Sequence, residues 1–209
     1  MTWWSWALVA ACAGPGALRQ QVGRADASQV ATDPRVREAQ QALGGVRARR
    51  ERAEADLARV RLELAAVERT LEIAEADEDA ADAELRAARL ARDAERRDAA
   101  QARREQARME GARARGERAW KRRDVTARDA VLTAARAEEQ LRGAEVELAR
   151  AERLAGDGEA GSYALSRFIA QRARLQAAWE NAERRAQSAT EDAAEAERRF
   201  RAGQPEEPA

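Results

Sequence analysis

Apolar residues recur at alternating intervals of three and four between residues 36 and 88. The series is Val36, Ala39, Leu43, Val46, Ala53, Leu57, Val60, Leu64, Val67, Leu71, Ala74, Ala81, Leu85 and Ala88, and only Arg50 and Glu78 interrupt it. Spacing of this kind, sustained over many heptads, indicates a helix with a seam that faces another helix. Asp33-Pro34 supplies its start, because Asp is a favoured N-cap and Pro is tolerated at the first helical position. Gly44-Gly45 is its weakest point.

A second series with the same spacing lies near the C-terminus. Its members are Leu165, Phe168, Leu175, Trp179, Ala182, Ala186, Ala189, Ala193, Ala196 and Phe200, interrupted by Arg172. Residues 156–162 are rich in glycine and predict a loop, and a weaker helical pattern precedes them at about 117–155. Because a short loop between helices of nearly equal length implies an antiparallel pair, we predict a C-terminal hairpin whose second helix is 163–202.

The sequence between these two series is harder to divide into separate helices. Residues 111–124, GARARGERAWKRRD, combine two glycines with a charge cluster and are a candidate bend, although a continuous helix also fits. A helix from about 34 to 110 would be roughly 115 Å long, and its seam would find too little partner surface within the chain. It therefore associates with another chain or bends back. We predict an all-α fold with a long helical coiled-coil region at 33–155 and an oligomeric assembly.

Composition narrows the function classes. The chain is 36% charged and 4% aromatic, has net charge zero, and contains no histidine and one cysteine. Abundant Ala, Arg, Glu and Leu are typical of long helices. Without histidine the usual general base and the commonest metal ligand are missing, and the acidic stretch 72–84 cannot converge its carboxylates from a helix. We therefore expect no enzyme, no cofactor, no metal site and no small-molecule substrate.

The N-terminal segment 1–12, MTWWSWALVAAC, is uncharged and ends at Cys12. It has the apolar stretch and small residues of a signal peptide, lacks the positively charged start, and is too short to span a bilayer. Its last four residues, VAAC, resemble the lipobox of bacterial lipoproteins, and the chain as a whole resembles Ala-rich periplasmic coiled-coil lipoproteins. The resemblance implies a lipid (palmitate) anchor on Cys12 and, since Ala13 rather than Asp follows, the periplasmic face of the outer membrane.

Two alternatives stay open for this segment: cleavage that discards Cys12, or retention as the apolar tail of a cytoplasmic coiled-coil protein. Residues 13–32, with several Gly, Pro and Ser, are predicted to be a flexible tether. Residues 203–209, GQPEEPA, are predicted to be a disordered tail.

An arginine-rich region between residues 86 and 123 is the remaining candidate site. Its candidate contacts with an anionic polymer or membrane surface are Arg113, Arg115, Arg118, Lys121, Arg122 and Arg123. Alternatively, these side chains form ion pairs along their helix or with the acidic stretch of a neighbouring helix. A neutral chain argues against nucleic acid. We expect a membrane-anchored scaffolding protein that acts through helix–helix contacts, with a second copy or another coiled-coil protein as partner.

Overall fold

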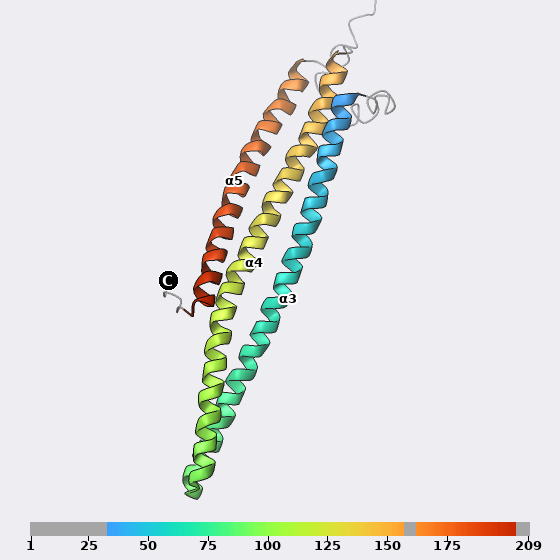
Figure 1. The fold of residues 1–209 in the computed structure, drawn as a ribbon. Helices are drawn as coiled ribbons and strands as arrows, with labels where there is room; N and C mark the ends of the chain where they lie inside the picture. Colours follow the sequence, from blue (N-terminus) through green and yellow to red (C-terminus); the bar gives the residue numbers. More distant parts are fainter. Residues whose placement is uncertain (1–32, 157–161, 204–209) are drawn as a thin grey trace, which may run out of the picture. The chain divides into compact units, whose positions relative to one another are not determined.

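A computed structural model of the chain describes residues 33–156 and 162–203 (Figure 1). These residues form three helices, α3 (Pro34–Ala91), α4 (Ala94–Gly156) and α5 (Ser162–Arg201), and contain no strand. The predicted all-α fold is therefore confirmed. The lipobox segment 1–12, the predicted tether 13–32, residues 157–161 of the predicted loop and residues 204–209 of the predicted tail lie outside the described residues. Within the described ranges, no helix has both the length and the apolar character needed to cross a membrane.

Helix α3 begins where the sequence predicts it. The carboxylate Oδ1 of Asp33 accepts a hydrogen bond from the backbone N–H of Arg35 at 2.8 Å, and the carbonyl of Asp33 accepts one from the N–H of Arg37 at 3.1 Å. Asp33 is thus the N-cap, and Pro34 occupies the first helical position, where its missing N–H leaves no bond unmade.

The connection between α3 and α4 lies at Arg92-Asp93, and not in the candidate bend 111–124. Arg92 has a φ of 56° and donates its N–H to the carbonyl of Arg89, while the N–H of Asp93 bonds to the carbonyl of Ala88. These two bonds form a Schellman motif, which satisfies carbonyls at the end of α3. The carboxylate of Asp93 then accepts the N–H of Arg96 at 3.0 Å and caps α4.

Helix α4 runs without a break through residues 111–124. Its two glycines there allow close approach of neighbouring side chains. A Cβ atom at Gly116 would lie 3.2 Å from Cδ2 of Phe200, and one at Gly111 would lie 3.8 Å from the Cβ of Ala74. The glycines that suggested a bend from the sequence therefore serve packing inside a continuous helix.

The chain divides into two compact units, each built from segments of all three helices. The described part of the first unit comprises residues 33–51, 134–156 and 162–182. There Val36, Val46 and Leu141 are fully buried, Arg49 of α3 pairs with Glu138 of α4 at 2.6 Å, and Arg172 of α5 pairs with Glu145 of α4 at 3.3 Å.

The described part of the second unit comprises residues 52–133 and 183–203. Its core includes Ala53 and Leu57 of α3 packed with Leu132 of α4. Helix α5 lies antiparallel to α4, because Phe200 lies beside Gly116 while Ala193, earlier in α5, shares a hollow with Ala127, later in α4.

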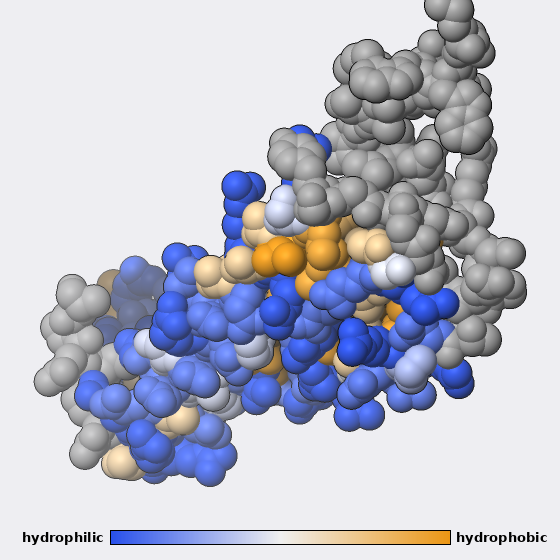
Figure 2. Space-filling model, turned by 90° about the horizontal axis from the view of Figure 1, so that it is seen from above, coloured by the Kyte–Doolittle hydropathy of each residue, from blue (hydrophilic) through white to orange (hydrophobic). Residues whose placement is uncertain are grey.

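The predicted seam of α3 is the face that the fold buries. Every buried residue of α3 belongs to the series predicted between residues 36 and 88, and the two interrupting residues, Arg50 and Glu78, are partly buried in it. On α5 the predicted positions are likewise at least partly buried, except Arg172, which is exposed. Hydrophilic residues cover most of the described surface on the face drawn in Figure 2.

Candidate functional site

The candidate anionic-partner contacts all lie on α4 in the second unit, and most of them lie opposite carboxylates of α3. Four of the six form ion pairs across the two helices: Arg115 with Glu75 at 3.7 Å, Arg118 and Arg122 with Glu68 at 3.2 Å each, and Lys121 with Glu63. Arg113 and Arg123 are exposed on the same helix. The structure therefore brings most of these cations onto acidic side chains of the same chain.

The same pattern continues toward the α3–α4 turn. The acidic stretch 72–84 faces arginines of α4: Arg108 pairs with Glu78 and Arg104 with Asp82, both at 2.6 Å, and Arg103 pairs with Glu84 at 2.9 Å. The hydrogen bond from Arg108 lowers the pKa of the Glu78 carboxyl and raises the pKa of its own guanidinium. Among the described residues no group of carboxylate, His or Cys side chains is arranged to hold a metal ion.

Lys121 has the most specific surroundings of the candidate residues. Its Nζ lies 4.3 Å from the centroid of the Trp120 ring and donates a hydrogen bond to the Glu63 carboxylate, and its side chain is only 12% exposed. That hydrogen bond is the main cause of a lowered pKa at Glu63. The ring of Phe200 from α5 lies 6.3 Å from the Trp120 ring, tilted by 34°. Trp120 thus links α3, through Lys121 and Glu63, to α5.

Close to Trp120, a hollow of about 100 Å³ lies between α4 and α5. Trp120, Ala127, Thr190, Ala193 and neighbouring charged residues line it. The indole Nε1 of Trp120 is buried and has no hydrogen-bond partner among the described residues. The hollow is only a few water molecules in size, which suits packing between helices better than a substrate.

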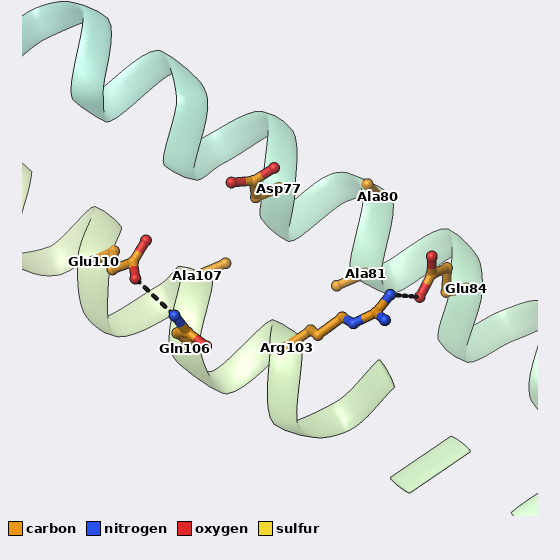
Figure 3. Close-up of a pocket in the computed structure, with 8 residues that line it drawn as sticks. All are labelled: Asp77, Ala80, Ala81, Glu84, Arg103, Gln106, Ala107 and Glu110. Carbon is orange, nitrogen blue, oxygen red and sulfur yellow. Dashed lines mark hydrogen bonds and ion pairs between the residues drawn. The ribbon is translucent and has the colours of Figure 1, made fainter. Parts of the chain in front are cut away.

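A larger groove of about 360 Å³ lies between α3 and α4 near the turn (Figure 3). Ala81 and Ala107 point into the space between the helices, and Ala80 adds a third small side chain. Around them stand Asp77, Glu84, Arg103, Gln106 and Glu110; Arg103 bonds to Glu84, and Gln106 donates to Glu110 at 3.0 Å. The groove combines an alanine floor with a mainly acidic rim.

Comparison with known proteins supplies no family for this chain. No family model, curated protein or solved structure matches it.

The sequence predicted part of this site. Ion pairing between the arginines and an acidic neighbouring helix was one of the two interpretations, and the geometry favours it for Arg115, Arg118, Lys121 and Arg122. The partners of Trp120 were not predicted. The spacing of Phe200 along its series placed that residue on a seam, but the pattern alone could not say which part of α4 it meets. Cys12 lies outside the described residues.

Proposed function

We propose that this protein is a structural, membrane-anchored coiled-coil lipoprotein of a bacterial cell envelope that acts through helix–helix contacts. The observation that carries the structural role is the ion pairing between α3 and α4 in the second unit. Charged side chains paired in this way set the register of the two helices, and a helical hairpin is suited to spacing or tethering other components. The partner is a second copy or another helical protein.

The proposed anchor is a lipid on Cys12 at the periplasmic face of the outer membrane. Its support is the resemblance of Val9-Ala10-Ala11-Cys12 to a lipobox, followed by Ala13. Acyl chains gain about 0.8 kcal/mol per buried methylene, so more than one chain on a single cysteine would hold the protein firmly on a membrane.

Metabolic labelling with a palmitate analogue tests the anchor. We expect label on the wild-type protein in the membrane fraction, no label on Cys12→Ser, and normal labelling of the matched control Ala17→Ser. Wild-type protein that carries no label and is recovered from the cytosol would overturn the proposal in favour of a cytoplasmic coiled-coil protein.

The alternative, a module that binds an anionic polymer or membrane surface, has weaker support. Its candidate cations Arg115, Arg118, Lys121 and Arg122 already have carboxylate partners, so binding an anion would require breaking those pairs.

A further inference from the structure

Helix α3 carries a second apolar series in the second unit, displaced by two residues from its buried seam. Its members are Ala55, Leu62, Ala66, Ile73, Ala76, Ala80, Ala83, Ala87 and Leu90, with Arg59 and Arg69 at the two remaining positions, and all of them are exposed. We call these positions the outer stripe. Two residues correspond to a rotation of about 200° around a helix, so the outer stripe lies opposite the seam that packs on α4.

The large side chains of the outer stripe are the exposed large apolar residues of α3. Leu62 is 74%, Ile73 is 62% and Leu90 is 87% exposed. Single exposed apolar residues are normal on a protein surface. A series that keeps the alternating spacing of three and four over many turns is different, because this spacing is what a helix presents to a partner helix.

Helix α4 provides an internal comparison in the same unit. Gly116, Trp120 and Ala127 of α4 are each displaced by two residues from a position that faces α3. Helix α5 lies against all three. Helix α4 thus has two opposite apolar faces in this unit, and each has a partner, α3 on one face and α5 on the other. On α5, the face opposite its seam carries Arg184, Ser188, Glu191, Glu195 and Arg198, as expected for a face in water. The outer stripe resembles the covered face of α4 and not the polar face of α5.

The charges beside the outer stripe indicate which helix would fit. Glu72, Asp77 and Asp79 flank it and form no ion pair with any described residue, although acidic neighbours such as Glu78 and Asp82 do. Two cations also lack an ion pair among the described residues, Arg69 within the stripe and Arg86 beside it, so the flanks carry more negative than positive charge. A second copy of α3 in parallel alignment would bring one acidic stretch against another, which is unfavourable. A helix with basic flanks would instead pair with these carboxylates.

We propose that the outer stripe of α3 binds an amphipathic α-helix of another protein whose apolar stripe is flanked by Lys and Arg. The alanines between Ile73 and Leu90 allow this helix to approach closely, while Leu62, Ile73 and Leu90 supply larger apolar contacts. This inference rests on the proposed function, since it names the partner of a protein that works through helix contacts. It does not depend on the lipid anchor.

The probe is a fluorescently labelled synthetic peptide of four heptads, with Leu and Ala at its core positions and Arg at its flanks. Its matched control has Glu at the same flanks. We expect the full chain to bind the Arg peptide at least tenfold more tightly than the Glu peptide by fluorescence anisotropy, with affinity falling steeply as salt rises. Equal binding of the two peptides, or binding of neither, would overturn the proposal.

Variants locate the binding surface. Leu62→Gln/Ile73→Gln should weaken binding of the Arg peptide at least tenfold, whereas Ile169→Gln, at an exposed isoleucine of α5, should leave it within twofold. Asp77→Asn/Asp79→Asn should weaken it severalfold and flatten its salt dependence. Circular dichroism checks that each variant remains helical. Unchanged binding by Leu62→Gln/Ile73→Gln would overturn the proposal.

Sedimentation of the chain alone tests the other occupant. A dimer that Leu62→Gln/Ile73→Gln dissociates, in a chain that binds neither peptide, would assign the outer stripe to a second copy and overturn the basic partner. The palmitate labelling is independent of these measurements, so failure of the docking surface and failure of the anchor are distinguishable.

Discussion

Individual charged residues on the α3–α4 face of the second unit differ in how much water they retain. Most of the pairs are half exposed, and such pairs contribute only about 0–1 kcal/mol each. The Glu63–Lys121 pair is different, because the Lys121 side chain is largely covered and lies over the Trp120 ring. Removing its carboxylate would leave a poorly hydrated ammonium group without its anionic partner.

Acid should therefore weaken the Glu63–Lys121 pair. The pKa of Glu63 is lowered by the hydrogen bond from Lys121, so its stabilising contribution is complete above the ordinary glutamate value of 4.5 and is lost as the pH falls through the lower pKa of the folded state. We expect Glu63→Gln to lower the free energy of unfolding at pH 7 by up to about 1 kcal/mol. On acidification from pH 7 to pH 3, the variant should lose less of its free energy of unfolding than the wild type, because it has no carboxylate at position 63 to protonate.

Urea unfolding followed by circular dichroism at several pH values measures this effect. Glu72→Gln is the matched control, because Glu72 is an exposed carboxylate of α3 without an ion pair among the described residues. Equal pH dependence of Glu63→Gln and the wild type would contradict the prediction.

At the scale of the helices, the seams could be predicted from sequence and the turn could not. The seam of α3 is readable because burial follows a regular spacing from Val36 to Ala88. The turn was missed because its left-handed residue is Arg92, where Gly is the usual choice, while Gly111 and Gly116 suggested a break elsewhere. Asp93, a good N-cap just beyond the end of the α3 series, was the available signal.

Glycines within the helices are accordingly of two kinds: some have open space where a Cβ would lie, and others lie close to another side chain. A Gly→Ala substitution distinguishes the two kinds. Added Cβ atoms at Gly44 and Gly45 would meet no atom within 4 Å, so Gly44→Ala and Gly45→Ala should each raise the free energy of unfolding by about 1 kcal/mol.

The control is Gly116→Ala, whose Cβ would lie 3.2 Å from Phe200. We expect it to gain less than the other two variants or to destabilise the protein, as measured by urea unfolding. A gain at Gly116 equal to that at Gly44 would show that the Phe200 contact imposes no constraint.

At the scale of the whole molecule, charge is balanced rather than sparse. The chain is 36% charged and has net charge zero, so it experiences no overall self-repulsion that salt could relieve. Its many exposed ion pairs lose strength when salt screens them. In strongly charged proteins, the screening of ion pairs is offset by relief of self-repulsion. In this chain salt weakens the ion pairs without such an offset.

We expect the melting temperature to fall by roughly 3–6 °C when sodium chloride is raised from low concentration to 1 M, because a loss of 1–2 kcal/mol corresponds to a shift of this size. Thermal unfolding followed by circular dichroism checks this, with sodium fluoride as a second salt. An unchanged or higher melting temperature would mean that the ion pairs contribute no net stability and serve only to set the register of the helices.

The connection at Arg92-Asp93 also has a consequence for the order in which the chain folds. Pairs between α3 and α4 are nested around it, with sequence separations of 19 residues for Glu84–Arg103, 30 for Glu78–Arg108, 50 for Glu68–Arg118 and 89 for Arg49–Glu138. Once the innermost pair has formed, each following pair closes only a short additional loop, so its entropic cost is small. The two longest helices of the protein can therefore close progressively from their turn, and the most distant residues of the hairpin meet last.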